Sequence, residues 1–585
     1  MNEDLCKRIM NAIERELGST NINISIRCEG GIVYIRGDTN TWDEVVKIGK
    51  IAASFEEVID VVNDAWPRTL PKKERKVVLK EPAEWDGIES DVVIIGAGIV
   101  GCTIARELSQ YDLRVIVVEK ENDVGWGSTK GNAGWVHAFA GLSADPSALK
   151  SRLCVEGSKL FPKIARELGI PYIQRPLLAL VFDEELLEVI DIMKEVAEAH
   201  GIEVKILRSR EEVKKIEPNA PDNVLAGILF PTYATTFPVE AAIAIAENAA
   251  ANGVKFIFDT EVIGFEIENN IIKAVVTNRG KINTKYVINA AGVYADDIAE
   301  LAGVRTFTIH PRKGVMIVVD ESIWKYNTNP IIASLHGDEE TKGGGILLVP
   351  RGNVVIGPNA KEVPYKDDLS VDLEDVQEVL AKFSPIIGRI PQDAILTQYA
   401  GIRAATYKED FVIGPTRVKG FINAAGMQSP GLTAAPAVAK MIAQILKKEG
   451  LELKERGNFS PTRRVPLRPP PESLKDWPNF DGVPPVVSSM SPEEIDGLIK
   501  MRPEFGEVIC RCQKVTVGEV VEAVRRGART LDGLKYRVGT QSGRCQGGFC
   551  TPRLILLLSQ ILGVPPHTIT KKENVSYLVL YEAGR

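Results

Sequence analysis

The sequence has no long apolar run, no excess of positive charge and no apolar segment at its start. No uninterrupted apolar stretch reaches the roughly 18 residues that a membrane-spanning helix requires, so we expect no direct membrane span. The net charge of −7 argues against a general nucleic-acid binder. Residues 1–8 lack the apolar core of a secretory signal, and we therefore expect a cytoplasmic protein.

Cysteine is scarce too, with 8 residues among 585. Without an export signal we expect no disulfide framework. Four cysteines are scattered singly, whereas the other four gather near the C-terminus and predict a metal site. The scattered four are Cys6, Cys28, Cys102 and Cys154, and the gathered four are Cys510, Cys512, Cys545 and Cys550.

The length predicts three or four domains, because one domain averages about 150 residues. Apolar strands alternate with amphipathic helices over residues 89–450, which predicts an α/β fold: a Rossmann-like cofactor-binding domain with an α+β substrate domain. A small α+β module (1–67) and a charged linker (68–88) precede it. A Pro-rich connector (451–505), which we expect to be too rigid and polar to pack as a core, and a small module containing the cysteine cluster (506–585) follow it.

The N-terminal module has the predicted order helix, strand, strand, helix, strand. Its segments 31–37 and 57–63 resemble the BON domain family, which supplies docking modules rather than enzymes. A plain α-β-β-α-β cap without a docking role remains the alternative.

A glycine pattern follows the first buried strand of the central domain. After Asp91, residues 92–95 are wholly apolar and lead into the G-x-G-x-x-G of residues 96–101, which opens a helix. In this pattern Gly96 permits a tight turn, Gly98 lets the backbone approach a pyrophosphate, and Gly101 allows helix and strand to pack closely. The second strand (114–118) ends at Glu119, where an acid can accept hydrogen bonds from an adenosine ribose. The context predicts dinucleotide binding rather than a structural glycine turn.

Three further sequence segments distinguish FAD from NAD as the bound dinucleotide. Residues 287–296, 399–403 and 420–436 resemble the FAD-dependent glycine-oxidase and glycerol-3-phosphate-dehydrogenase group of the D-amino-acid-oxidase-like superfamily. The resemblance covers about 90–450 and implies FAD as the cofactor. We favour noncovalent binding, with a covalent link through His137 as the alternative. The resemblance implies FAD contacts at Gly96, Gly98, Ile99, Val100, Gly101, Glu119, Lys120, Ser128, Thr129, Asn132, Ala133, Val262, Ala291, Gly292, Gly426, Gly431, Leu432 and Thr433.

The same resemblance implies a small anionic substrate. An arginine in the family's Gly-x-Arg phrase holds the substrate's anionic group, and Arg403 occupies that position; a structural salt bridge is the alternative. Arg312 or Lys313 could add a second positive charge. The family commonly has Pro where this chain has Ala404, and its membrane-type glycerol-3-phosphate dehydrogenases differ at 313–316, which weakens the substrate assignment.

Oxidation of a carbinol also needs a base, and the chain has 5 histidines. His137 closes the Gly-rich segment after Glu119 and is our first candidate. His310 is the second candidate, and His200 has the position of a helix C-cap.

The C-terminal cysteines form C-x-C and C-x4-C pairs, unlike zinc fingers or plant and bacterial ferredoxins. The phrase 543–550 resembles the bacterioferritin-associated-ferredoxin-like [2Fe-2S] module, which implies that Cys510, Cys512, Cys545 and Cys550 hold a cluster. Zinc, or no metal, remains the alternative.

The order of FAD domain and [2Fe-2S] module resembles the catalytic subunit of the anaerobic glycerol-3-phosphate dehydrogenase family. It implies oxidation of sn-glycerol 3-phosphate to dihydroxyacetone phosphate by hydride transfer to flavin N5, with electrons leaving through the cluster to a protein acceptor. It also implies a hetero-oligomer with a second flavoprotein and a small cysteine-rich carrier, peripheral to the membrane through these partners. The alternatives are a dehydrogenase of L-2-hydroxyglutarate or a proline-like amino acid, and a non-catalytic protein for electron transfer or docking.

Overall fold

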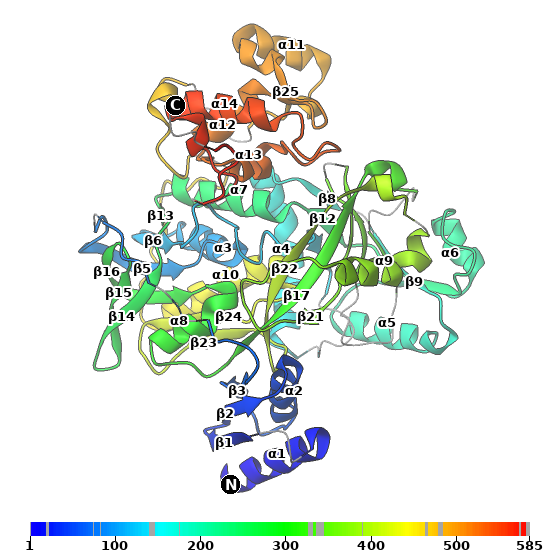
Figure 1. The fold of residues 1–585 in the computed structure, drawn as a ribbon, viewed down its shortest axis with the longest axis vertical. Helices are drawn as coiled ribbons and strands as arrows, with labels where there is room; N and C mark the ends of the chain where they lie inside the picture. Colours follow the sequence, from blue (N-terminus) through cyan, green and yellow to red (C-terminus); the bar gives the residue numbers. More distant parts are fainter. Residues whose placement is uncertain are drawn as a thin grey trace.

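The computed structural model describes most of the chain. The described residues are 2–18, 23–73, 75, 77–81, 83–139, 145, 147–174, 176–325, 331–334, 344–350, 352–388, 390–462, 466–477, 484–572 and 575–580. Two large sheets lie side by side in the centre, with a small N-terminal unit at one end and a C-terminal unit at the other (Figure 1). The α/β architecture predicted from the sequence is confirmed.

The N-terminal unit has the predicted α-β-β-α-β order. In its sheet β1 pairs antiparallel with β2, and β2 pairs parallel with β3 and β4. The apolar faces of both helices pack on the sheet. Cys6 and Cys28 form a disulfide, which corrects the expectation that both stand singly. The elements are α1 (Asn2–Leu17), β1 (Asn23–Glu29), β2 (Ile32–Thr39), α2 (Trp42–Ala53), β3 (Asp60–Asn63) and β4 (Trp66–Pro67).

The first large sheet is the predicted Rossmann-like layer. Its strand order is β13-β6-β5-β16-β15-β14, and β24 pairs with β16 and β23. Both faces of β5 are buried: Val92 and Ile94 pack against α3, α7 and α10, whereas Val93 and Ile95 pack on the side of α8. The strands are β5 (Ile88–Ile95), β6 (Val115–Val118), β13 (Lys255–Ile257), β14 (Val262–Glu268), β15 (Ile271–Thr277), β16 (Gly280–Asn289), β23 (Val412–Pro415) and β24 (Phe421–Ala425). The helices are α3 (Ile99–Leu108), α7 (Pro238–Ala251), α8 (Ala295–Leu301) and α10 (Gly431–Lys448).

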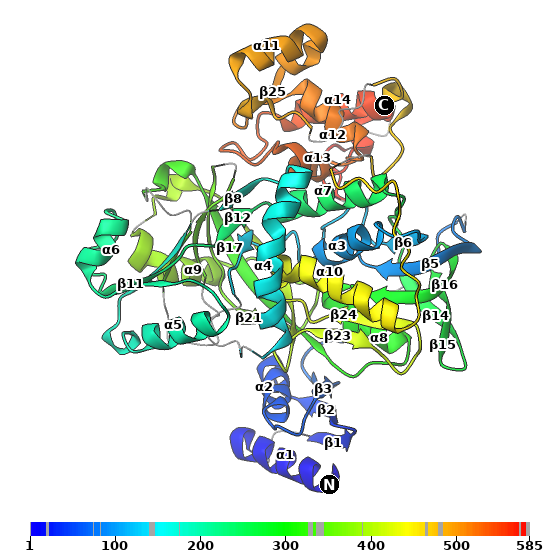
Figure 2. The ribbon, with the colours of Figure 1, turned by 180° about the vertical axis from the view of Figure 1, so that it is seen from behind.

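The second large sheet lies in the part of the chain predicted to form the substrate side. Its order is β10-β11-β9-β18-β19-β20-β17-β21, and the long β22 pairs antiparallel with β17. Its strands are β9 (Leu177–Val181), β10 (Lys205–Leu207), β11 (Ala226–Phe230), β17 (Ile309–Val319), β18 (Ile331–Ser334), β19 (Gly345–Leu348), β20 (Val354–Gly357), β21 (Lys361–Glu362) and β22 (Ile395–Thr406). A small sheet contains β7 (Trp135–Val136), β8 (Tyr172–Gln174) and β12 (Ala234–Thr236). The helices are α4 (Leu149–Leu168), α5 (Val189–Ala199), α6 (Arg210–Ile216) and α9 (Leu373–Ile387). Figure 2 shows α4 and α10 crossing the back of the molecule.

The C-terminal unit packs on the first sheet's helices, with α13 beside α7 (Figure 2). The connector before it packs more closely than predicted, since Leu467 and Leu474 are buried in the cores on either side. The elements are α11 (Pro492–Met501), β25 (Val508–Cys510), β26 (Val515–Thr516), α12 (Val517–Arg525), α13 (Leu531–Val538) and α14 (Thr551–Leu562). Among the described helices of the whole chain, none combines the length and the apolar character that crossing a bilayer demands.

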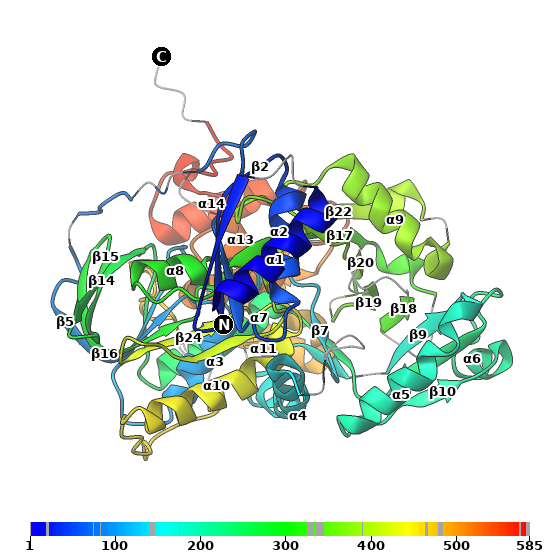
Figure 3. The same ribbon diagram turned by 90° about the horizontal axis from the view of Figure 1, so that it is seen from below.

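The N-terminal unit is docked next to the junction of the two large sheets (Figure 3). The buried Asn63 donates hydrogen bonds from its side chain to the carbonyl of Val45 (2.9 Å) and to the hydroxyl of Tyr407 (3.0 Å). Its backbone N–H donates to Thr308 Oγ1 (2.9 Å), and Arg305 forms an ion pair with Asp64 (2.7 Å). The unit is therefore fixed to the central domain by buried polar contacts.

Replacing Asn63 by Ala should loosen this docking. The change leaves the buried Tyr407 hydroxyl without its donor, which costs about 1–3 kcal/mol of stability. Limited proteolysis should release the N-terminal unit from the variant sooner than from the wild type. Equal cleavage rates would contradict the assignment of this contact. The exposed Asn219→Ala variant is the matched control, because its side chain bonds only within the substrate side.

Candidate functional site

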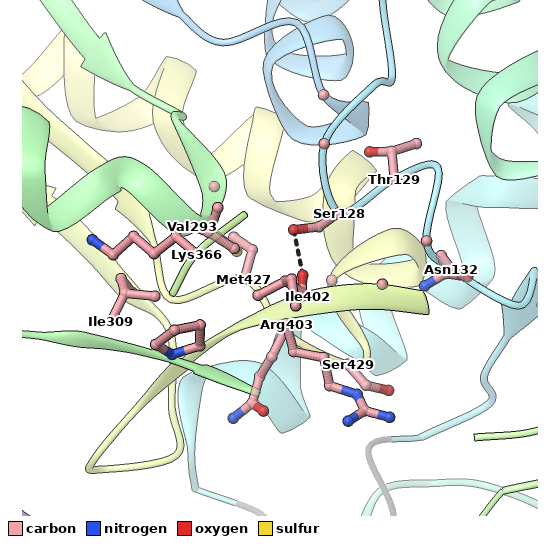
Figure 4. Close-up of a pocket in the computed structure, with 18 of the residues that line it drawn as sticks. Ser128, Thr129, Asn132, Val293, Ile309, Lys366, Ile402, Arg403, Met427 and Ser429 are labelled. Atoms are coloured by element: carbon pink, nitrogen blue, oxygen red, sulfur yellow. Dashed lines mark hydrogen bonds between the residues drawn. The ribbon is translucent and has the colours of Figure 1, made fainter. Parts of the chain in front are cut away.

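A cavity of about 1690 Å³ lies between the two large sheets. It exceeds the roughly 300–1,000 Å³ of a typical small-molecule pocket. Its walls come from the β5–α3 turn, the loop 119–137, the end of β16, strands β17 and β22, and the start of α10. Figure 4 shows how these segments converge on one space. Most of the predicted FAD contacts line this cavity; the exceptions are Gly101, Gly426 and Thr433.

The three glycines of the G-x-G-x-x-G pattern differ in whether the surrounding protein leaves room for a side chain. A Cβ at Gly101 would lie 1.9 Å from the carbonyl oxygen of Gly96, and one at Gly96, where φ is +100°, would lie 2.6 Å from that of Ala290. A Cβ at Gly98 would meet only Thr129 Oγ1, at 3.5 Å. Protein packing thus requires Gly96 and Gly101, whereas the space in front of Gly98 belongs to the cavity and forms an open cradle at the start of α3.

Glu119 and Val262 lie at the end of the cavity expected to hold the adenosine. The Glu119 carboxylate accepts hydrogen bonds from the N–H groups of Ala97 (2.7 Å) and Glu121 (2.9 Å), and burial raises its pKa. The Arg75 guanidinium donates to the Val262 carbonyl and pairs with Glu261 (2.9 Å). Arg75 belongs to the segment predicted as a linker, where nothing in the local sequence marks it as part of a site.

The loop 119–137 is held tightly between the sheets. Ser128 Oγ donates to the carbonyl of Ile402 (2.7 Å), as drawn in Figure 4. A Cβ at Gly131 would lie 2.3 Å from the Cα of Gly401. At the far end, the N–H of His137 donates to Thr433 Oγ1 (2.9 Å), so Thr433 positions the loop from outside the cavity lining.

The remaining predicted FAD contacts are two glycines with positive φ, Lys120 and several other residues of the cavity lining. Gly292 and Gly426 have φ of +59° and +69°, and a Cβ at Gly292 would meet nothing within 4 Å. Lys120 places its ammonium 3.7 Å from the Tyr294 ring centroid. The predicted residues Ile99, Val100, Asn132, Ala133, Ala291, Gly431 and Leu432 also line the cavity, as do the unpredicted Trp126, Trp135, Tyr294, Lys366, Met427 and Ser429.

Arg403 lines the cavity, and none of the described carboxylates forms an ion pair with it. Its Nη2 donates to the carbonyl of Asn359 (3.1 Å), and its buried Nη1 has no hydrogen-bond partner. Burial, with the nearby charge of Arg312, lowers the pKa of Arg403 to about 10, so the guanidinium stays charged at neutral pH. An unpaired buried charge is costly, and a bound anion would relieve that cost.

Arg312 and Lys313 are not among the residues that line the cavity, and both are already paired within the protein, which does not favour their expected role as a second substrate charge. Arg312 lies opposite Arg403 in the β17–β22 pairing, and its guanidinium is paired with Glu362 (2.7 Å) and Glu409 (2.7 Å). Lys313 is buried; it donates to the carbonyl of Ser370 (3.0 Å) and is paired with Asp375 and Asp368 (3.5 and 3.6 Å).

His137 lines the cavity and stands beside Ser429. Its Nε2 is 3.4 Å from Ser429 Oγ, and its ring packs against Trp135 and Tyr233 (ring centroids 5.5 and 5.8 Å apart). Burial lowers the pKa of His137 to about 4, so the imidazole is neutral at pH 7 and can accept a proton.

His310 and His200 lie away from this position. His310 is fully buried with Nδ1 2.8 Å from Glu362, and it stacks on Tyr407 outside the cavity lining. His200 caps the end of α5, with Nδ1 2.7 Å from the Val196 carbonyl oxygen. His336 lies outside the described residues.

The four C-terminal cysteines meet in two pairs. Cys512 and Cys545 are exposed with their sulfurs 3.3 Å apart, and Cys510 and Cys550 are buried. A hydrogen bond from Cys550 lowers the pKa of Cys510 to about 6, and backbone N–H groups of Gln513 and Gln541 support the same change. Within the described part of the chain no three metal-binding side chains are gathered around one ion position. Two thiol pairs suit a two-iron cluster, in which four thiolates hold two irons.

Comparison with known proteins agrees with both sites. Residues 91–445 match the family described as FAD dependent oxidoreductase, and residues 508–560 match the BFD-like [2Fe-2S] binding domain. The chain therefore belongs to the FAD-dependent oxidoreductases, and it carries a [2Fe-2S] domain in addition. FAD and a [2Fe-2S] cluster are its cofactors; the open cradle at Gly98 fits the first and the four thiols fit the second.

Three of the similar proteins are named for glycerol 3-phosphate or glycerophosphate. A glycerol 3-phosphate dehydrogenase of Caloramator mitchellensis is 36% identical over 84% of this chain and 98% of its own. One subunit of the anaerobic glycerol-3-phosphate dehydrogenase of Escherichia coli is 25% identical over 81% of this chain and 89% of its own. The FAD-bound structure of L-alpha-glycerophosphate oxidase from Mycoplasma pneumoniae has a TM-score of 0.60 at 27% identity, covering 65% of this chain and 99% of that one.

Replacing Gly98 by Ala should remove FAD without unfolding the protein. The new methyl group has only ordinary contact with Thr129 but fills the cradle that the pyrophosphate needs. The purified variant should show little flavin absorbance, with the cluster absorbance and far-UV circular dichroism of the wild type. Gly457→Ala, where a Cβ meets nothing within 4 Å, is the control. Full flavin content in Gly98→Ala would contradict the position of the pyrophosphate.

Proposed function

We propose that this protein is a dehydrogenase of sn-glycerol 3-phosphate that passes the electrons through its [2Fe-2S] cluster to a protein acceptor. The observation that carries the proposal is Arg403, a buried guanidinium whose Nη1 has no partner in a cavity that also contains His137. A guanidinium fork matches phosphate geometry. The names of the three similar proteins given above support this substrate over a 2-hydroxy acid or an amino acid.

The charge pattern of the site suits one small anion. Arg312 is neutralised by Glu362 and Glu409, so of these two neighbouring arginines Arg403 is the one without an acidic partner among the described residues. The substrate phosphate would accept hydrogen bonds from the Arg403 guanidinium, which leaves the carbinol end of the substrate to extend along the cavity.

His137 would act as the base. FAD, when bound, supplies the acceptor for the hydride that leaves C2 of the substrate. Neutral His137 takes the hydroxyl proton on Nε2, so the alcohol becomes a carbonyl and dihydroxyacetone phosphate is formed. Ser429, 3.4 Å from Nε2, would orient the ring. The N-terminus of α10 at Gly431 and Leu432 lines the same cavity and favours negative charge there.

Electrons would leave at the exposed side of the cluster. Cys512 and Cys545 are both exposed, so an acceptor protein can approach them. We infer a hetero-oligomer with a second flavoprotein and a small cysteine-rich carrier, in the cytoplasm and peripheral to the membrane through these partners. The Escherichia coli relative is named as one subunit of its enzyme, which supports a multi-subunit assembly. The N-terminal unit would be a BON-like docking module in the same assembly.

Arg403→Lys tests the substrate-binding role. Lysine keeps the charge but loses the fork, so KM for sn-glycerol 3-phosphate should rise at least about tenfold, with a smaller change in kcat. The measurement is steady-state reduction of an artificial dye under anaerobic conditions. The exposed Arg417→Lys variant, which bonds only Gly303 on the surface, should behave as the wild type. An unchanged KM in Arg403→Lys, or preferred turnover of L-2-hydroxyglutarate or L-proline, would refute the substrate assignment.

The pH dependence of flavin reduction tests His137. Because the pKa of His137 is depressed to about 4, its neutral form persists well below the usual histidine range. At saturating substrate the rate should therefore stay level from about pH 8 to about pH 6 and fall only in more acidic solution, and His137→Asn should lower it roughly 100-fold. Stopped-flow absorbance gives these rates. A fall centred near pH 6.5 would contradict the depressed pKa of His137. An Asn variant with the wild-type rate would exclude His137 as the base.

A further inference from the structure

The loop that lines the FAD cavity is contacted from outside by the C-terminal unit. Residues 119–121 and 126–132 of this loop line the cavity, but Asp123 between them points away from it. The Asp123 carboxylate pairs with Arg537 of α13 through two hydrogen bonds, Nη1–Oδ2 of 2.6 Å and Nη2–Oδ1 of 3.0 Å. The Arg537 side chain is 0% exposed and that of Asp123 is 7% exposed.

Neighbouring contacts join the same two segments. The ring of Trp126, which lines the cavity, meets Tyr536 of α13 edge-on with centroids 6.4 Å apart. The Asn122 carbonyl accepts from Arg468 of the connector, and the Asn122 side chain donates to the Lys572 carbonyl (2.7 Å). On its other side the loop is bonded to the fingerprint turn, from Gly125 N–H to the Ala97 carbonyl (2.9 Å).

We propose that Arg537 is a positioning residue of the FAD site: through Asp123 it fixes the cavity loop, so that the iron–sulfur domain is a structural part of flavin binding. The bidentate geometry matters because a guanidinium fork orients a carboxylate as well as attracting it. With the pair in place, Glu119 on one side of Asp123 and Trp126 to Asn132 on the other keep their positions toward the cofactor. The proposal concerns FAD retention, so it holds whichever substrate is oxidised.

A second buried ion pair provides a matched control. Arg526 of α12 pairs with Glu247 of α7 at 2.8 Å, and their side chains are 7% and 0% exposed. This pair also joins the C-terminal unit to the central domain, but neither residue lies in the cavity loop or lines the cavity. Breaking it should weaken the docking of the unit without releasing the loop.

The test measures the rate of FAD release from the full-length holoenzyme after dilution, followed by the rise in free-flavin fluorescence. Arg537→Gln and Asp123→Asn should release FAD roughly tenfold faster or more, the scale seen when supporting groups around a bound centre are removed. Arg537→Lys, which keeps the charge without the fork, should lie between these variants and the wild type. Arg526→Gln should release FAD at the wild-type rate, although its melting temperature also falls.

Each variant is accepted for comparison only with the cluster absorbance of the wild type, which shows that the C-terminal unit is folded. If Arg537→Gln does not fold, Arg537→Lys decides. Wild-type FAD release in Arg537→Lys and Asp123→Asn would overturn the proposal. Equal acceleration in Arg526→Gln would also overturn it, because domain docking in general, rather than this pair, would then hold the flavin.

Discussion

The close approach of two backbones between the large sheets is the constraint on which the site depends. The loop 119–137 passes so near to β22 that a Cβ at Gly131 would lie 2.3 Å from Gly401, and one at Gly401 would lie 2.5 Å from the Gly131 carbonyl oxygen. Only glycine permits this contact at both positions. It joins the fingerprint side of the cavity to the strand that carries Arg403, so cofactor and substrate groups share one space.

Charge within that space is unevenly compensated. Arg312 and Arg403 are neighbours across two strands, and both are largely removed from water. Two glutamates neutralise Arg312, whereas Arg403 has only a carbonyl on one nitrogen. An unpaired buried charge is unfavourable. A bound anion would therefore stabilise Arg403, which no carboxylate among the described residues pairs with. The neutral His137 in the same cavity adds a proton acceptor without a competing positive charge.

Features that depend on the spacing of residues close together in the sequence could be predicted from the sequence. The fingerprint glycines with Glu119, the element order of the N-terminal unit and the four clustered cysteines each depend on local spacing, and the structure places them as expected. The role of Arg312 and Lys313 could not be predicted, because it is set by Glu362, Glu409 and Asp375, which are distant in sequence. The Cys6–Cys28 disulfide, the packing of Leu467 and the Arg537–Asp123 pair are long-range contacts of the same kind.

The central claim is that electrons from sn-glycerol 3-phosphate enter at the flavin and reach the cluster within this one chain. The most direct measurement mixes the anaerobic holoenzyme with this substrate and follows flavin absorbance together with the electron paramagnetic resonance signal of the reduced cluster. Our account predicts that the flavin bleaches and that the cluster signal then appears, without any added partner protein. A flavin that stays oxidised would contradict the assigned reaction, and a bleached flavin with a silent cluster would contradict the assigned route.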